Sequence, residues 1–382
     1  MDFALSEEQQ LLQHSVERLF ADLYSFEARR RYMEEPRGWS LGLWERYGEL
    51  GLLGLPFAEE YGGSAGGPVE TMIVMEQIGR ALALEPYLAT VILAGGLIRL
   101  GGSKAMCAAV LPAIAAGDLS VSFAHTERQA RYDLADVAAT ARRDGSGYLI
   151  DGAKTLVPQG DSAEKFVVSA RLSGGQRDRD GLGLFLVDAK ATGVAVRGYG
   201  TVDGRRAAEV TLNGVRVDAD AAIGEPGLAF PLLEQVADHA MAALCAEAVG
   251  AMAAMHAETV EYLKTRKQFG VTIGSFQALQ HRAAEMLVGL EQARSMAMLA
   301  TMMAGEEDAR ERRAAISAAK VQIGRSGRSL GQAAIQLHGG IGMTMEAKVG
   351  HYFKRLTIID TQFGDADYHL GLLAASGGLI AA

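Results

Sequence analysis

One carboxylate stands out among the residues that could do chemistry, because it interrupts a long apolar segment. Glu247 is the only formal charge between His239 and His256, where almost every other residue is Ala, Met, Leu, Val or Gly. An ionised carboxylate in apolar surroundings is costly unless its pKa shifts or it has a partner. A carboxylate in such a setting is also what proton abstraction near neutral pH requires, so Glu247 is the candidate base. Helical spacing places it on one face with these side chains: Leu233, Val236, Ala240, Leu244 and Ala251.

The same residue has structural interpretations, which the residue types leave open. Glu247 could face a groove and pair with an arginine, or it could point to solvent. The helix predicted around it, from about 229 to 267, ends in the string Arg266-Lys267-Gln268-Phe269-Gly270. Cations in the last turn suit the helix dipole and a glycine suits the C-terminal cap, but neither explains Gln268 and Phe269.

Composition limits the classes of function. The net charge of −9 and the lack of a long basic run argue against nucleic acid as a partner. The two cysteines, Cys107 and Cys245, stand in Ala-rich surroundings and predict buried thiols of a reducing compartment, with no disulfide and no metal site. The first residues lack the cations and apolar run of a signal peptide, and the most apolar stretch, 240–255, is too short to span a bilayer. We therefore expect a cytoplasmic protein with no membrane span.

The hydrophobic period divides the 382 residues into three parts. Residues 1–118 are predicted to form an N-terminal α-helical domain, 119–225 a central antiparallel β domain, and 226–382 a C-terminal four-helix bundle. In the β domain, Asp151-Gly152 is a turn signal and Asn213-Gly214 is the strongest hairpin signal. The last helix is predicted to end near Leu370. The fold class is thus α+β and multidomain.

Six strings occur in a fixed order along the chain: Phe3–Gln9, Glu49–Leu55 with Glu59–Gly63, Gly102–Lys104 with Leu111-Pro112 and Gly117-Asp118, Asp151–Lys154, Arg266–Gly270, and Gln336–Gly340. Together they resemble the acyl-CoA dehydrogenase family of flavoproteins over essentially the full length. The resemblance implies FAD, bound between the β domain, the helical bundle and a neighbouring subunit. No G-x-G-x-x-G follows a predicted strand, so a Rossmann site is not expected.

The resemblance also implies roles for individual residues. Thr126 matches the family's threonine beside the flavin ring, Phe123 matches the aromatic before it, and Val157 lies where the chain would contact the isoalloxazine. The remaining cofactor residues belong to two loops that would meet FAD across a subunit interface: Arg266 and Phe269 at the pyrophosphate and adenine, and Gln336, Gly339 and Gly340 at the other end, where glycines permit close approach.

Departures from the family pattern are informative. The Glu-Pro and Ala-Gly-Ser-Asp that usually follow the flavin threonine are replaced by 127–133, and the usual Trp and Thr of the next strand are Leu156 and Pro158. The family's catalytic Glu-Gly-Thr is missing, because counting from Gly340 places Phe363 where that Glu stands. Phenylalanine cannot accept a proton. Either the base lies elsewhere or this subunit performs no chemistry.

Glu247 is the predicted replacement, because some branches of the family place the base on this same long helix. It lies two turns beyond the usual alternative position, here Ala240, which is about 10 Å along the axis. Three aspartates near the standard position are rivals: Asp360, Asp365 and Asp367.

The C-terminal strings resemble in particular the small subunits of heteromeric bacterial acyl-CoA dehydrogenases, of the pimeloyl-CoA and steroid side-chain type. This implies a homo- or hetero-tetramer, with a homologous larger subunit as the possible partner. The expected reaction is α,β-dehydrogenation of an acyl-CoA thioester, with the α-proton passing to a carboxylate, the β-hydride to flavin N5, and electrons then to an electron-transfer flavoprotein. Two alternatives stay open: a non-catalytic subunit that cradles FAD, and a relative of the acyl-CoA oxidases or flavin monooxygenases, which aerobic peroxide formation would reveal.

Overall fold

The computed structural model describes residues 5–377, so Phe3 of the opening string lies outside the described residues. Internal contacts divide the chain into two compact units. The first consists of Met1–Arg31, Pro68–Ala83 and Met241–Ala382, and the second of Tyr32–Gly67 and Leu84–Ala240. The helical N-terminal region, the central sheet and the C-terminal helices confirm the predicted fold class. The domain boundaries at 118 and 225 stay predictions.

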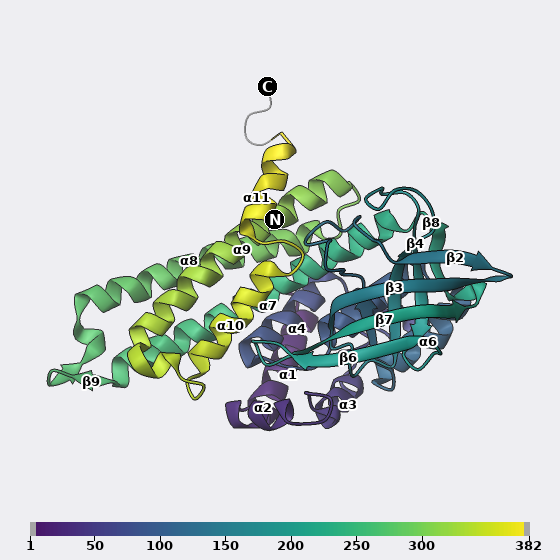
Figure 1. Ribbon diagram of the computed structural model, residues 1–382. Helices are drawn as coiled ribbons and strands as arrows, with labels where there is room; N and C mark the ends of the chain where they lie inside the picture. The colour runs from purple at the N-terminus through teal and green to yellow at the C-terminus, as the bar shows by residue number, and fades with distance from the viewer. Residues whose placement is uncertain (1–4, 378–382) are drawn as a thin grey trace. The chain divides into compact units, whose positions relative to one another are not determined.

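The first unit is helical and contains the C-terminal bundle (Figure 1). α9 packs against α8, α10 and α11. The predicted last helix is in fact two helices, because the chain turns at residues 362–365. The elements of this unit are α1 (Glu7–Leu23), most of α2 (Phe26–Met33), α4 (Pro68–Ala81), the larger part of α7 (Phe230–Thr265), β9 (Lys267–Gln268), β10 (Val271–Thr272), η4 (Ile273–Ser275), α8 (Gln277–Met303), α9 (Ala309–His338), η5 (Gly339–Met343), α10 (Lys348–Thr361) and α11 (Ala366–Ala375).

Two glycines let α4 and α7 cross with their backbones in contact. A Cβ atom at Gly79 would lie 1.9 Å from the carbonyl oxygen of Glu247, and one at Gly250 would lie 1.8 Å from the carbonyl oxygen of Glu76. Neither position tolerates a side chain without moving a helix. The crossing therefore fixes the segment of α7 that carries Glu247.

The second unit is built on one sheet with strand order β6-β7-β3-β2-β4-β5-β8, in which β1 pairs with β4. The sheet is antiparallel apart from the β1–β4 pair and one β2–β4 residue pair, which are parallel. The elements of this unit are α3 (Leu41–Glu49), η1 (Glu59–Tyr61), the π-helix η2 (Tyr87–Ala94), α5 (Gly95–Gly101), α6 (Lys104–Ala116), β1 (Val121–Ala124), β2 (Thr140–Asp144), β3 (Gly147–Pro158), β4 (Lys165–Arg171), β5 (Leu182–Asp188), β6 (Val194–Gly200), β7 (Arg206–Val217), η3 (Ala219–Ala221) and β8 (Ala222–Gly227).

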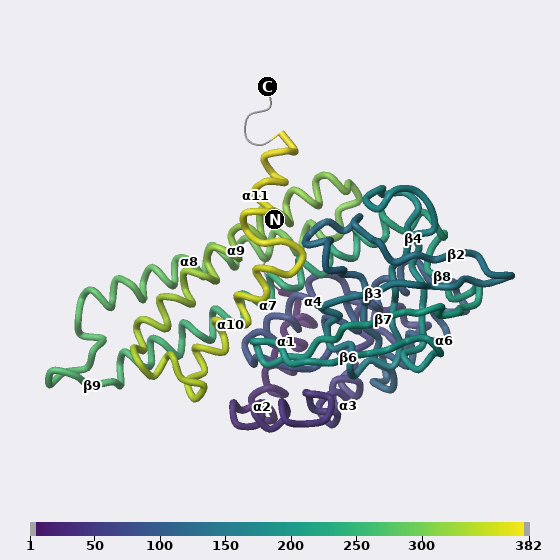
Figure 2. Tube along the Cα trace, viewed as in Figure 1, coloured from purple at the N-terminus to yellow at the C-terminus, as the bar shows by residue number. Residues whose placement is uncertain are grey.

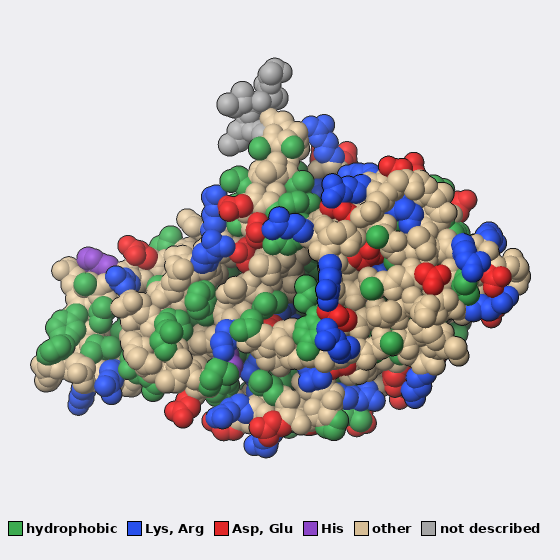
Figure 3. Space-filling view, in the orientation of Figure 1, with side chains coloured by type: hydrophobic (Ala, Val, Ile, Leu, Met, Phe, Trp, Pro, Cys, Tyr) green, Lys and Arg blue, Asp and Glu red, His purple; other side chains and the backbone are tan. Residues whose placement is uncertain are grey.

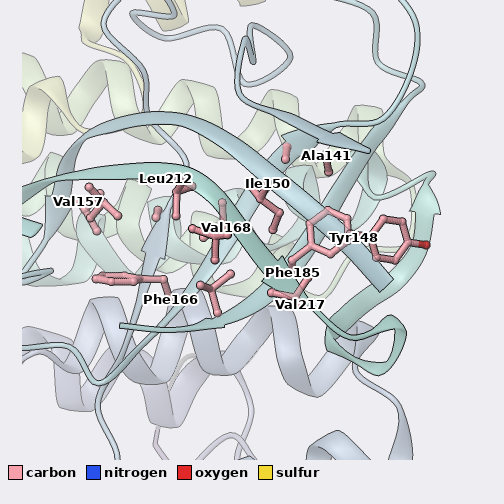
Figure 4. Packing of buried hydrophobic residues seen from close by; sticks show 14 of the residues in the cluster. Ala141, Tyr148, Ile150, Val157, Phe166, Val168, Phe185, Leu212 and Val217 are labelled. Atoms are coloured by element: carbon pink, nitrogen blue, oxygen red, sulfur yellow. The ribbon is translucent and has the colours of Figure 1, made fainter. Parts of the chain in front are cut away.

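Alternate residues of the strands form the core of this sheet, where aromatic and β-branched side chains interdigitate (Figure 4). The predicted hairpin at Asn213-Gly214 is wrong, since β7 runs through it. Gly214 instead donates its N–H to the Asp151 carboxylate, 2.7 Å away, beside a register shift between β3 and β7. Asp151-Gly152 and Asn213-Gly214 are both typical of turns, but here they form irregularities that lie opposite each other in β3 and β7.

The composition predicted two buried cysteines and no membrane span. Cys107 and Cys245 are both buried and free, as predicted. α7 is the one helix among the described residues that is long and apolar enough to cross a membrane, and 83% of its most apolar window is buried. Burial of this kind is typical of a core helix.

Candidate active site

Glu247 lies in the core of the first unit and is paired with an arginine. The Nε and Nη2 atoms of Arg355, on α10, donate to the two carboxylate oxygens of Glu247 at 2.7 Å each. Glu247 is 0% exposed and Arg355 is 2% exposed. This is the bidentate geometry of the strongest charge-assisted hydrogen bonds.

The pair bears directly on the predicted base. Each oxygen of Glu247 accepts one hydrogen bond from the guanidinium, so taking up a proton would remove the negative charge that strengthens both bonds. Removing one charge would leave the other buried and uncompensated. The geometry therefore favours the structural interpretation that the sequence left open, and the catalytic role of Glu247 stays a prediction.

The three rival aspartates lie at the turn between α10 and α11, and two of them stabilise it. Asp360 binds Arg328 at 3.0 Å and accepts the N–H of Ala366 at 3.2 Å. Asp365 caps α11 by accepting the N–H of Tyr368 at 2.9 Å, and Asp367 is exposed in the first turn. Phe363, which the sequence predicts at the family's base position, is half-buried with a left-handed φ of 59°.

The two predicted interface loops lie at the same end of the bundle. The rings of Tyr262, near the end of α7, and His338, at the end of α9, are stacked with centroids 4.4 Å apart. Arg266 follows the first ring in sequence, and Gln336 precedes the second. The hairpin of β9 and β10 projects from this end, as the trace in Figure 2 shows.

These loops present the groups that an adenine nucleotide would need. Arg266 is exposed and has no ion-pair partner within residues 5–377. Gln336, Gly339 and Gly340 are exposed, and a Cβ at either glycine would meet nothing within 4 Å. A cation, an amide and open glycine backbone fit a pyrophosphate, and an exposed aromatic ring fits a base. The residues present therefore fit FAD.

Phe269 is the most exposed large hydrophobic residue described, at 89%. Its φ of 55° is left-handed, a conformation that costs a bulky residue roughly 1–2 kcal/mol. Its one printed ring contact within the described residues is an edge-on contact with Phe276, with centroids 6.1 Å apart, and this contact leaves most of the ring exposed. Hydrophobic side chains gather at this end of the bundle in Figure 3, and those exposed in the hairpin and the adjoining loops are Phe269, Val271, Phe276, Ile341, Met343 and Met345.

The predicted ring-contact residues lie in the second unit. Phe123 is buried in β1, and Thr126, just beyond β1, is half-buried with its carbonyl accepting the N–H of Thr155 at 2.8 Å. The side chain of Val157 is 0% exposed in the sheet core, which leaves its backbone for the predicted ring contact (Figure 4). Its neighbour Leu156, which has a left-handed φ, is 57% exposed and takes the surface position.

A buried polar network that the sequence did not reveal includes both sequence neighbours of Thr126, His125 and Glu127. The Nζ of Lys154 donates to Glu127 at 2.7 Å, to the Oγ of Ser169 at 3.1 Å and to the carbonyl of His125 at 3.3 Å. Glu127 also accepts the backbone N–H groups of Ala138 at 2.9 Å and Ala139 at 3.0 Å. The only signal in the sequence was the lysine of the Asp151–Lys154 string.

Burial and the neighbouring charges set the ionisation of this network. Burial lowers the pKa of Lys154 to about 8, against the opposing effect of Glu127. Burial alone would raise the pKa of Glu127, but Lys154 and the hydrogen bonds lower it overall. Burial, assisted by the Lys154 cation, lowers the pKa of His125 to about 3. Near neutral pH the network therefore holds an ion pair and a neutral imidazole.

The stretch between residues 127–133 and β2 is fixed by one buried arginine. Arg171 at the end of β4 is 7% exposed and spans this segment and the loop before β5. Five backbone carbonyls accept from its guanidinium, those of Ala135, Val137, Gln176, Asp178 and Asp180.

Comparison with known proteins accounts for nearly the whole chain. Family models of acyl-CoA dehydrogenase match its N-terminal domain at residues 6–118, its middle domain at 122–215 and its C-terminal domain at 230–378. The probable acyl-CoA dehydrogenase FadE25 of Mycobacterium tuberculosis is 33% identical over 78% of this chain and 77% of its own length. A variant of the Tcur3481-Tcur3483 steroid ACAD superposes with a TM-score of 0.87 at 29% identity over 97% of each chain. The ChsE4-ChsE5 complex from Mycobacterium tuberculosis gives 0.87 at 26% identity over 98% of each chain.

Proposed function

Because the chain belongs to the acyl-CoA dehydrogenase family, and so acts in the FAD-dependent dehydrogenation of an acyl-CoA thioester, we propose that it works as one subunit of a heteromer. In this proposal a homologous chain supplies the carboxylate that takes the α-proton. The observation that carries it is the buried Glu247–Arg355 pair, together with Phe363 at the family's base position. Both places where this chain would hold a base are then occupied by structural groups.

The exposed end of the bundle supports a partner subunit. An aromatic side chain that is strained and solvent-exposed in one chain is stabilised when another chain or a ligand covers it. Phe269 meets this description, and apolar residues of the adjoining loops surround it. One structural neighbour is a complex of two different chains, ChsE4 and ChsE5. We propose a larger homologue as the partner and so a hetero-tetramer, because in a homo-tetramer every subunit would lack the base in the same way.

We assign the cofactor contacts by the same reasoning. Arg266 and Phe269 would hold the pyrophosphate and adenine of FAD, and Gln336, Gly339 and Gly340 would accept the cofactor across an interface. Phe123 and Thr126 would contact the ring, with Leu156 at the surface position beside the buried Val157. When bound, FAD supplies the hydride acceptor. The protein excludes water and aligns the thioester.

The acyl group and the electron acceptor are part of the proposal. A neighbour described as a steroid ACAD supports a bulky, ring-bearing acyl group. We propose that electrons leave through an electron-transfer flavoprotein and that the protein is cytoplasmic. No cluster of three or more potential metal ligands occurs in the described part of the chain.

A second candidate, in which Glu247 itself is the base, is favoured by its position on the apolar stretch of α7. A test that separates the two is co-expression with the neighbouring homologous gene, followed by flavin-to-protein stoichiometry and turnover on straight-chain and ring-bearing acyl-CoA thioesters. Glu247→Gln and Arg355→Gln are then compared in this assembly. If the pair is structural, both variants lose stability and flavin together, and the residual turnover per bound flavin stays near that of the unaltered protein.

If Glu247 is the base, Glu247→Gln loses turnover by several orders of magnitude at normal flavin content, whereas Arg355→Gln does not. That outcome would refute the proposal. So would full turnover of this chain purified alone, with no homologous partner present.

A further inference from the structure

His125 is a buried imidazole fixed between the two residues expected to touch the flavin ring. It is 7% exposed and follows β1 directly. Its ring stacks on that of Phe123 with centroids 5.2 Å apart and an interplanar angle of 10°. Its Nδ1 lies 2.9 Å from the Oγ of Ser169 on β4. A buried position just beyond β1 therefore carries an oriented polar ring.

The hydrogen bonds determine which nitrogen of His125 carries the proton. The hydroxyl of Ser169 is 0% exposed and has two partners among the described residues, Lys154 and His125. An ammonium can only donate, so Ser169 accepts from Lys154. The hydroxyl proton then has one remaining acceptor, the Nδ1 of His125. This imidazole is therefore neutral, with its hydrogen on Nε2.

The Nε2–H group of His125 has no acceptor within residues 5–377. Fully enclosed side-chain atoms without a hydrogen-bond partner in the described structure include one each on Asp161, Gln362 and His369. Nε2 of His125 is not among them, so it reaches the small exposed part of its residue. A buried ring thus offers one donor at the protein surface. Because the pKa of His125 is lowered to about 3 by burial and by Lys154, the ring stays neutral through the physiological range.

The chain places this donor beside the expected ligand. Phe123 and Thr126 bracket His125 in sequence, and the Phe123 ring lies against the imidazole. A planar ligand that contacts Phe123 and Thr126 lies against the segment that carries His125, whose ring is stacked on Phe123. Lys154 binds the carbonyl of His125, and Thr155 binds that of Thr126, so the segment is held from the sheet side.

We propose that the Nε2–H of His125 donates a hydrogen bond to an acceptor atom of the ligand bound at Thr126. This inference rests on the proposed function. The acceptor is an oxygen or ring nitrogen, supplied either by the isoalloxazine or by the thioester carbonyl of the acyl-CoA. Ser169 and Lys154 are positioning residues, because they fix the tautomer without touching the ligand.

The test uses the FAD-containing assembly as it purifies and compares His125→Gln with His125→Leu. A glutamine amide can place a donor near the Nε2 position, whereas leucine cannot donate. If the acceptor is on FAD, His125→Leu weakens FAD affinity roughly three- to tenfold and shifts the flavin absorption bands, and His125→Gln restores most of the affinity. If the acceptor is on the thioester, FAD affinity and spectrum stay unchanged, and acyl-CoA binding to the oxidised protein weakens by a similar factor in His125→Leu alone.

A third variant removes only the proton in question. Incorporation of Nε2-methylhistidine at position 125 keeps the acceptor for Ser169 and should reproduce the loss seen with leucine. Equal affinities for FAD and acyl-CoA in the unaltered, leucine and methylhistidine proteins would overturn the inference. If His125→Leu fails to fold, the methylhistidine protein alone decides. The proposed function fails separately, if the unaltered assembly binds no FAD.

Discussion

Breaking the Glu247–Arg355 pair should be among the most destabilising single changes in this protein. The pair consists of two hydrogen bonds of 2.7 Å between groups that are 0% and 2% exposed. Removing either partner leaves the other charged and buried, which costs about 3–5 kcal/mol. Glu247→Met and Arg355→Met should each lower the free energy of unfolding by about this much.

The double variant separates the pair from its surroundings. Two apolar side chains of similar length leave no charge unpaired, and such replacements are often close to neutral. Glu247→Met/Arg355→Met should therefore lose far less than the sum of the single changes, with a coupling energy of about 2 kcal/mol or more. The assay is urea unfolding followed by circular dichroism, at one protein concentration for all four proteins, because assembly contributes to apparent stability. Single changes that cost under about 1 kcal/mol, or that simply add, would refute the reasoning.

Three other predictions follow from the described contacts. Gly250→Ala should lower the free energy of unfolding by at least about 1–3 kcal/mol and reduce the folded yield, because its Cβ would lie 1.8 Å from a backbone oxygen. Gly371→Ala on α11 is the matched control. A Cβ there would meet nothing within 4 Å, so this change should be neutral or slightly stabilising. The pKa of His125 falls from 6.5 to about 3 on folding, so the unfolded chain binds the proton more readily, and the free energy of unfolding should fall by up to about 1.4 kcal/mol per pH unit between about pH 6.5 and about pH 3. In acid titrations of stability, His125→Phe should therefore show a shallower slope than the unaltered protein. Identical slopes would contradict this prediction. Phe269→Ser should lower the flavin occupancy, measured by absorbance, and the mass of the assembly, measured by light scattering. The stability of the isolated chain should stay unchanged. A loss of stability instead would mean that packing of the ring within the chain stabilises the fold.

Much of the fold could be predicted because hydrophobic period and capping act locally. Ser6 begins α1 with a capping box, and the long apolar run of α7 is helical as predicted. Local signals failed where a distant strand decided the outcome. Asn213-Gly214 favours a tight hairpin, but β3 on one side and β6 on the other continue the ladder past it. The final helix was predicted as one although Gly364 and the N-cap Asp365 are local signals of a break, which the prediction did not use.

The site was harder to predict because its key contacts join residues that are far apart in sequence. Glu247 and its partner are separated by 108 positions, so the sequence could suggest an arginine without identifying Arg355. Lys154 and Glu127 are 27 positions apart, and their pairing depends on the approach of β1 to β3. The exposure of Leu156 in place of Val157 depends on a left-handed backbone angle that no residue type there favours. The positions of Arg266 and Gln336 at one end of the bundle depend on helix lengths, which were predicted closely.

The Lys154–Glu127 ion pair restricts which substitutions these two positions can accept during evolution. Each ammonium hydrogen already has an acceptor, and the carboxylate accepts from Lys154, Gln129, Ala138 and Ala139. A descendant that lost either charge alone would pass through a poorly folded intermediate, so the two positions should be inherited together or replaced together. Among relatives, a neutral residue at one of these two positions should be accompanied by a neutral residue at the other. The exposed arginines nearby should vary independently.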